Sequence, residues 1–261
     1  MIKLIASDLD GTLLQNGAQD LNPGTTELIH ELTRQGRIFV ASSGRQYHNL
    51  CRLFGPVKDE IAFICENGAL VMYKDEIIAK HVIDRQTGQE ILKTVVDRKG
   101  SEALLSGVHT CYIQPKDPAY LVHLRDVVKN DVTVVDDILE TSEDYLKISV
   151  YEKAGINNSE EYWKEKFGDR VTVVTSGMAW LDTVPKGINK GTAMQDLMEK
   201  FNISREECMA FGDHYNDVEM LEMAGYDFAM ENAQEGIREM CHYKTHLVEK
   251  TLKEVLGGKY D

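Results

Sequence analysis

Short apolar runs alternate with helix-like stretches over the first 65 residues. Apolar runs at 2–7, 37–43 and 61–65 predict buried strands. Between the first two, Pro23 and Gly36 fit the start and the end of a helix. A second apolar stripe, at helical spacing over 47–54, predicts another helix. This strand–helix–strand–helix–strand order is typical of a parallel sheet with right-handed crossovers.

The pattern changes in the middle of the chain and then resumes. Between 83 and 183 we expect two helices and separate short strands, at 87–98, 118–129, 132–135, 146–151 and 171–174. After 184 the alternation returns, with a helix, a strand, a helix and a strand expected at 191–201, 208–211, 218–224 and 227–230. The sequence therefore predicts an α/β fold. Its core, residues 1–82 and 184–261, is a Rossmann-like parallel sheet, and an α+β domain is inserted at 83–183.

The charge balance narrows the classes of partner. The chain of 261 residues is 43% hydrophobic and 28% charged, which is ordinary for a globular protein. Its formal net charge of −14 disfavours binding to nucleic acids and to anionic membranes, which it would repel. An anionic small molecule would be repelled at long range too, so a phosphate site has to be made locally positive.

Cysteine usage and the first residues bear on the compartment. The five cysteines include no CxxC spacing, which indicates buried thiols in a reducing cytosol rather than disulfides or a zinc site. Met1 leads directly into the first expected strand, so we expect no signal peptide, and no apolar run reaches membrane-span length. We expect a cytoplasmic protein, and the sequence gives no indication of its oligomeric state.

Two aspartates, Asp8 and Asp10, follow the first expected strand directly. Residues two apart on a strand face the same side, and Gly11 allows an abrupt turn after them. Close carboxylates repel each other unless a cation lies between them, and Mg²⁺ accepts one or two carboxylates together with substrate phosphate. The plain alternative is a strand followed by an Asp-Gly turn.

Three further polar segments follow strands or begin helices, as the first aspartates do. With residues 8–12 they are 42–45, 186–191 and 212–217. Ligands of an open parallel sheet bind outside the carboxyl ends of its strands, so segments distant in sequence are expected to converge there.

Taken in order, the motifs resemble the haloacid dehalogenase-like hydrolase superfamily, and within it the Cof-type sugar phosphatases. The resemblance covers essentially the whole chain. It rests on DLDGTLL at the start, SGR after the second strand, ENGA after the third, and then NKG, GDxxND and AMENA. The position of the insertion also matches the large cap of that subfamily.

The resemblance implies a role for each matching residue. Asp8 corresponds to the nucleophile and Asp10 to the general acid and base. Phosphate-binding positions are Ser43, Gly44, Lys190, Asn216 and the backbone of Leu9. Asp213 joins Asp8 and Asp10 as a ligand of the Mg²⁺ cofactor, and Asp217 supports Lys190 or the metal site. Arg45 and Asn67 are candidate substrate contacts.

Several of these assignments keep an alternative. Ser42 competes with Ser43 for the phosphate, because adjacent strand residues point in opposite directions. Lys186 competes with Lys190, although Lys190 lies at a helix start, where anions bind naturally. Asp217 is also a plausible cap for the following helix. Asn67 belongs to a segment that is equally readable as a plain turn.

The expected activity is Mg²⁺-dependent hydrolysis of the phosphate ester of a small metabolite, such as a sugar phosphate, through an aspartyl-phosphate. A carboxylate nucleophile divides the reaction into two displacements, and catalysis is mostly positioning and charge neutralisation. A phosphosugar mutase is one alternative, for which four cap arginines are available: Arg85, Arg98, Arg125 and Arg170. A non-catalytic sensor of phosphorylated metabolites is the other. The sequence does not identify the substrate or the cap residues that select it.

Overall fold

The computed structural model describes residues 1–260 and divides the chain into two compact units. The first unit consists of residues 1–43, 50–79 and 189 onward, and the second of residues 44–49 and 80–188.

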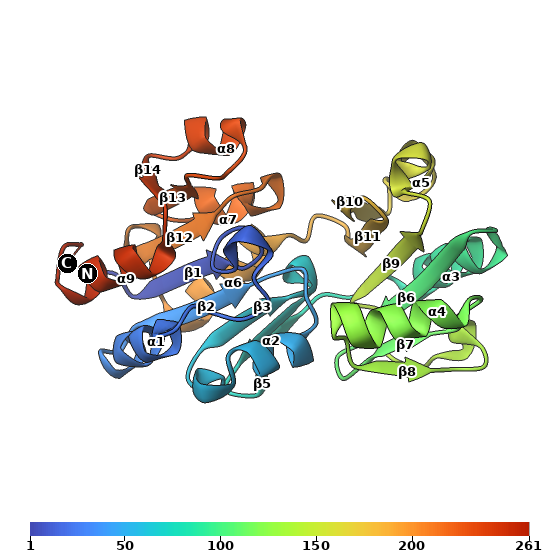
Figure 1. Ribbon diagram of the computed structural model, residues 1–261, viewed down its shortest axis with the longest axis horizontal. Coiled ribbons are helices and arrows are strands. Elements are labelled where there is room, and N and C mark those ends of the chain that lie inside the picture. The colour runs from blue at the N-terminus through green and yellow to red at the C-terminus, as the bar shows by residue number, and fades with distance from the viewer. Residues whose placement is uncertain (261) are drawn as a thin grey trace. The chain divides into compact units, whose positions relative to one another are not determined.

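An eight-stranded sheet forms the centre of the first unit (Figure 1). Its spatial order is β14-β13-β12-β1-β2-β3-β4-β5. The bounds are β1 Leu4–Asp8, β2 Ile38–Ser42, β3 Ala62–Cys65, β4 Leu70–Tyr73, β5 Glu76–Lys80, β12 Cys208–Gly212, β13 Tyr226–Met230 and β14 Tyr243–Thr245.

The central strand β1 is buried along its whole length, as expected for a strand inside a parallel sheet. It pairs in parallel with β2 on one side and β12 on the other, so the carboxyl ends of all three strands lie at one edge. Strand β4 reverses direction, because it pairs antiparallel with β3. This edge is where the sequence motifs converge.

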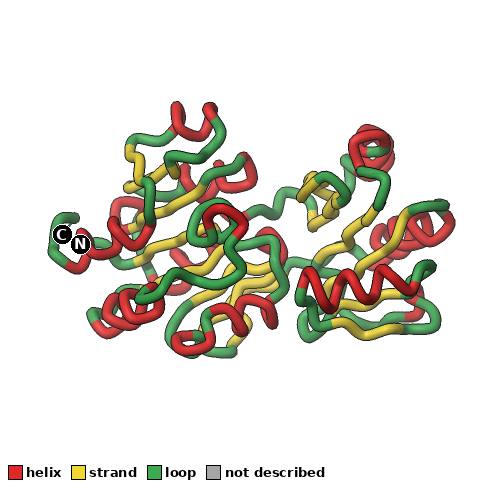
Figure 2. The backbone as a smooth tube through the Cα atoms, in the orientation of Figure 1, coloured by secondary structure: helices red, strands yellow, loops and turns green. Residues whose placement is uncertain are grey.

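Helices flank the sheet of this unit, as Figure 2 shows. Their bounds are α1 Thr25–Arg34, α2 Tyr47–Leu53, α6 Lys190–Phe201, α7 Val218–Glu222, α8 Glu235–Met240 and α9 Val248–Leu256. The first three residues of α2, 47–49, cluster with the second unit. α1 packs against α9, and α6 packs against α7. Asn189 caps α6, because its side chain accepts a hydrogen bond from the backbone N–H of Thr192 at 2.9 Å. This N-terminal cap fixes the residue at which α6 begins, and therefore the position of Lys190, the first residue of the helix.

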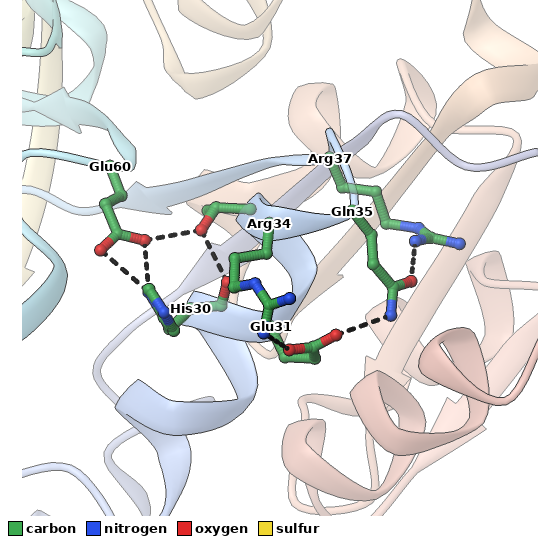
Figure 3. A network of polar contacts seen from close by, with 7 residues as sticks. His30, Glu31, Arg34, Gln35, Arg37 and Glu60 are labelled. Atoms are coloured by element: carbon green, nitrogen blue, oxygen red, sulfur yellow. Dashed lines mark hydrogen bonds and ion pairs between the residues drawn. The ribbon is translucent and has the colours of Figure 1, made fainter.

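The exposed side of α1 carries a network of polar contacts (Figure 3). Glu60 lies 2.8 Å from His30 Nδ1 and accepts a hydrogen bond from Thr33 Oγ1 at 2.7 Å. Nearby, Gln35 donates to Glu31 at 3.1 Å and accepts from Arg37. These contacts join α1 to the segments that follow it.

The second unit is built around a six-stranded sheet with the order β10-β11-β9-β6-β7-β8. The pairs are antiparallel except β7 with β8. The strands are β6 Ser101–Ser106, β7 Cys111–Ile113, β8 Val132–Val134, β9 Lys147–Glu152, β10 Val171–Gly177 and β11 Trp180–Pro185. The helices are α3 Arg85–Asp97, α4 Pro118–Val122 and α5 Glu160–Phe167. Trp163 and Phe167 of α5 pack with Ile91 and Val95 of α3 into one hydrophobic core.

The predicted fold class is confirmed, and the differences are local. The helix expected at 118–129 is interrupted, because α4 ends at Val122 and continues as a π-helical turn over His123–Val128. Strands β4, β5, β6, β7, β11 and β14 and helices α5, α8 and α9 were not predicted. The chain passes between the units at residues 79/80 and 188/189. The boundaries predicted from the sequence were 82/83 and 183/184. It also makes an additional excursion over 44–49.

No helix within residues 1–260 is both long enough and apolar enough to cross a membrane.

Candidate active site

Four of the predicted site residues come from two strand ends, one helix start and one 3-10 turn of the first unit. Asp8 is the last residue of β1, and Lys190 is the first residue of α6. Asp213 directly follows β12, and Asp217 ends the 3-10 turn Tyr215–Asp217 that precedes α7. The sheet topology thus brings together residues that lie more than a hundred positions apart.

Lys190 lies between two carboxylates at the centre of the site. Its Nζ donates to Asp8 Oδ1 at 2.5 Å and to Asp217 Oδ1 at 2.6 Å, and all three residues are buried. The competing lysine, Lys186, is exposed in the second unit and donates to the carbonyl of Gly168. The cation beside Asp8 is therefore Lys190.

Asp217 also organises the loop that carries Asp213. Its second oxygen, Oδ2, accepts from the backbone N–H groups of Asp213 at 3.0 Å and His214 at 3.1 Å. One carboxylate thus fixes both the lysine and the loop. The predicted capping of the following helix is not found, because the Asp217 side chain makes no cap hydrogen bond to α7.

Three carboxylates gather at this point, those of Asp8, Asp213 and Asp217. One oxygen from each carboxylate lies within 4.8 Å of those of the other two. Asp10 is exposed and stands outside this group of residues, and its role as a metal ligand remains a prediction. Oxygen donors of this kind suit a hard divalent cation, and three carboxylates against one ammonium leave an excess of negative charge for such a cation to balance.

Burial and repulsion control the protonation of the site. Burial, followed by the charge of Asp217, raises the pKa of Asp8 to about 8, even though Lys190 opposes the shift. The pKa of Asp213 is raised for the same two reasons. Burial disfavours the charged form of Lys190, but Asp217 and Asp8 outweigh it and hold the lysine pKa above its usual value. Lys190 therefore stays charged, but its single positive charge does not balance the negative charge of the carboxylates around it.

Two glycines make room for the functional groups. Gly11 has φ +96°, and a Cβ there would overlap the carboxylate of Asp213. Gly68, with φ +105°, approaches the backbone oxygen of Asn189, and a Cβ there would overlap it. Since Asn189 directly precedes Lys190, the close approach at Gly68 sets the position of the α6 start.

The second and third motifs meet through backbone hydrogen bonds. Ser43 N donates to Ile64 O at 2.9 Å, and Asn67 N donates to Ser43 O at 3.1 Å. Ser42 is in register with Asp8 and its fully buried Oγ has no hydrogen-bond partner within residues 1–260, so the choice between the two serines stays a prediction.

The other predicted residues lie along the same segments. Leu9 is buried and Asn216 half-buried. Within the second unit, Arg45 is half-buried and donates to Asn49 Oδ1 at 3.4 Å.

Sequence reasoning missed two residues that hold the first motif. Thr12 Oγ1 donates to Asp213 Oδ1 at 3.1 Å, and Asn232 Nδ2 donates to the carbonyl of Gly11 at 2.8 Å. Both signals were present: Thr12 belongs to DLDGT, and Asn232 follows strand β13 at the same sheet edge.

Comparison with known proteins places this geometry in a family. The family model for haloacid dehalogenase-like hydrolases matches residues 5–251. The 5-amino-6-(5-phospho-D-ribitylamino)uracil phosphatase YbjI of Escherichia coli is 28% identical over 250 residues, covering 93% of this chain and 90% of that protein. The HMP-PP phosphatase of Yersinia enterocolitica is 26% identical, covering 89% and 85%.

Solved structures agree. A crystal structure of a protein from Eubacterium rectale, 28% identical, superposes with a TM-score of 0.88 and covers 97% of this chain and 99% of that one. The resemblance seen in the motifs is confirmed. The chain belongs to the haloacid dehalogenase-like hydrolase family and is a phosphoric monoester hydrolase.

Proposed function

We propose that this phosphatase acts on phosphate monoesters of small cytoplasmic metabolites, sugar phosphates among them, through an aspartyl-phosphate at Asp8. The observation that carries the proposal is the buried contact between Asp8 and Lys190 at the carboxyl end of β1. An ammonium held there neutralises phosphoryl oxygens as they arrive, and it keeps one oxygen of Asp8 oriented while the other attacks.

The reaction divides into two displacements. Asp8 Oδ2 attacks phosphorus, the ester bond breaks, and Asp10 gives its proton to the leaving alkoxide. Asp10 then takes a proton from water, which attacks the phosphorus of the acyl-phosphate. Inorganic phosphate leaves and the Asp8 carboxylate is restored. The exposure of Asp10 suits this role, because it has to reach both the leaving group and water.

Ser43 and the backbone N–H groups of Leu9 and Gly44 are the proposed partners of the phosphoryl oxygens. Asn216 joins them, Asp217 orients Lys190, and Arg45 and Asn67 are the proposed substrate contacts. The hydrogen bond from Asn67 N to Ser43 O supports a shared position for these segments.

Mg²⁺ is the proposed cofactor, and the residues fit it. Asp8 and Asp213 would hold the ion together with Asp10, and Asp217 lies within the same carboxylate group. When bound, Mg²⁺ supplies positive charge that favours the ionised form of Asp8 and offsets the charge of the phosphoryl group.

The mutase alternative needs cap arginines that converge on a second phosphate. The four arginines considered for this role contact four different partners: Arg85 the Thr141 carbonyl, Arg98 Glu152, Arg125 the Val132 carbonyl and Arg170 Glu90. This dispersal favours hydrolysis over phosphoryl transfer between sugars. The sensor alternative lacks support, because Asp8, Asp10 and Asp213 are all present.

The test is phosphate release from a panel of phosphorylated metabolites, in Mg²⁺ and in EDTA. The compound named for the Escherichia coli relative, 5-amino-6-(5-phospho-D-ribitylamino)uracil, belongs in the panel beside hexose and pentose phosphates. We expect release that EDTA stops and Mg²⁺ restores. Full activity in EDTA would overturn the metal assignment, and exchange of phosphate between sugars without release would favour the mutase.

A further inference from the structure

The segment Gly44–Asn49 directly follows the phosphate-binding candidate Ser43, yet it clusters with residues 80–188. Ser43 itself belongs to the first unit, so the chain leaves that unit at the peptide bond between Ser43 and Gly44. The carbonyl of that peptide belongs to Ser43, and its N–H belongs to Gly44. Whatever orients this peptide therefore orients a proposed phosphate donor.

Three polar side chains hold the segment within the second unit. Lys147 Nζ donates to the Gly44 carbonyl at 2.8 Å. Gln46 Oε1 accepts from the backbone N–H of Asp131 at 3.1 Å, and Asn49 Nδ2 donates to Val128 O at 3.1 Å. Lys147 is the only charged group of the three, and its contact is the one nearest to Ser43 in the chain.

The position of Lys147 is set by buried partners. Lys147 is 7% exposed and begins strand β9. Its Nζ lies 3.6 Å from Asp182 Oδ2, and Asp182 Oδ1 accepts from Ser149 Oγ at 2.6 Å. A hydrogen bond from the Lys147 ammonium to a carbonyl is charge-assisted.

Gly44 needs such a partner because glycine has no side chain to restrict its backbone. On the Ser43 side, the hydrogen bond from Asn67 N to Ser43 O fixes the first peptide. On the other side, the bond from Lys147 to Gly44 O fixes the next one. Between these two anchors the direction of the Gly44 N–H is determined.

We propose that Lys147 is a positioning residue for phosphate binding: its ammonium holds the Gly44 carbonyl so that the Ser43–Gly44 peptide presents its N–H to the phosphoryl group. The proposal rests on the proposed function of Ser43 and Gly44. Lys147 acts through the backbone and touches no substrate atom in this account.

The experiment compares Lys147→Met with Lys116→Met, a matched loss from the same unit. Lys116 Nζ also donates to backbone carbonyls, those of Val95, Arg98 and Ser101, at 2.7, 2.8 and 2.6 Å, none of which lies in the segment 44–49. The substrate is p-nitrophenyl phosphate and the probe of binding is competitive inhibition by inorganic phosphate. We expect Lys147→Met to raise KM and the inhibition constant of phosphate by about tenfold, the loss of one charge-assisted hydrogen bond.

Lys147→Arg should recover most of this loss, because it keeps a charged donor. Lys116→Met should leave both constants near wild type. If Lys147→Met does not fold, Lys147→Met combined with Asp182→Asn removes the carboxylate charge that would otherwise remain unpaired, and the same tenfold loss is expected.

Unchanged phosphate inhibition in the Lys147 variants would overturn the positioning role. Equal losses in the Lys147 and Lys116 variants would overturn it too, because they would show a general effect of structure. A wild-type protein that releases no phosphate from any ester would instead contradict the proposed function, and the two failures are therefore distinguishable.

Discussion

Two networks of polar contacts in the first unit have contacts of similar length in very different surroundings. On α1, His30 Nδ1 lies 2.8 Å from Glu60, with side chains 52% and 33% exposed (Figure 3). At the site, Lys190 Nζ lies 2.5 Å from Asp8 and 2.6 Å from Asp217, with side chains 1%, 8% and 0% exposed.

The difference shows that burial, more than distance, decides what an ion pair does. Water screens the exposed network, whose pairs are worth about 0–1 kcal/mol each. The buried groups have lost their water, and removal of one partner from such a pair costs about 3–5 kcal/mol because a charge is left uncompensated. The exposed network therefore contributes little to stability, whereas the buried network keeps charged groups in place at the candidate active site.

The largest expected effect follows from Lys190→Met. The change leaves the carboxylates of Asp8 and Asp217 buried without their cation, so the metal-free protein should lose about 3–5 kcal/mol of unfolding free energy. The melting temperature should fall by about 10 °C, and kcat should fall at least about a thousandfold. Thermal unfolding and phosphate release measure the two effects.

The matched control is Lys186→Met, which removes an exposed lysine four positions earlier. It should leave both quantities nearly unchanged. Near-normal turnover in the Lys190 variant would contradict the role given to the buried network.

Asp8→Asn should abolish turnover and also change how stability depends on pH, and the two effects can be measured separately. The amide cannot form an acyl-phosphate, so turnover should fall by more than about a thousandfold. Burial raises the pKa of Asp8 to about 8 in the folded protein, against 3.8 when unfolded. The stability that this group contributes is therefore present below about pH 4 and lost as the pH rises towards 8.

The variant lacks this titration. In EDTA, the melting temperature of wild type should decline relative to that of Asp8→Asn between pH 5 and pH 8. Parallel pH profiles of the two proteins would show that Asp8 does not titrate as proposed.

The sequence was sufficient for the parts of this comparison that depend on local pattern. The apolar run before Asp8 predicted β1, and the alternation of strands and helices predicted a parallel sheet whose edge gathers the motifs. Pairings that depend on exact distances were beyond it. The resemblance implied that Asp217 supports Lys190 or the metal site, but that it shares Lys190 with Asp8, and that Lys147 reaches Gly44, follow from tertiary packing that no spacing in the chain encodes.

Strand β5 and the excursion over 44–49 were not predicted, for related reasons. Strand β5 is largely exposed, so its pattern lacks the apolar run of a buried strand. The excursion over 44–49 was missed because polar side chains attach it to the second unit, and they leave no hydrophobic period.

A smaller effect is expected from Gly68→Ala, which disturbs the buried network indirectly. The new Cβ would overlap Asn189 O and shift the start of α6, and with it Lys190. We expect kcat to fall about tenfold, together with a loss of about 1–3 kcal/mol of stability.

Gly36→Ala is the control for backbone strain alone. Gly36 also has positive φ, +82°, but nothing lies within 4 Å of its added Cβ. It should lose stability without loss of kcat. Equal kcat values in the two variants would show that Gly68 does not act on catalysis through the position of Lys190.

The smallest effect should come from the exposed network. Glu60→Gln removes the charge opposite His30 but keeps an acceptor for Thr33. We expect a change of less than about 1 kcal/mol in unfolding free energy, diminished further by salt, and no change in kcat. A chemical denaturation series at low and high salt measures it. A loss as large as that of Lys190→Met would contradict the distinction between the two networks.

The division of the chain at Ser43 has a consequence for making chimeras. Gly44–Asn49 clusters with residues 80–188. If residues 80–188 alone were replaced by the insert of another protein, the new insert would lie against a hexapeptide that matches the original insert. Gln46 and Asn49 would face backbone groups they were not matched to. A transplant from another member of this family should therefore carry two pieces, the long insert and its hexapeptide.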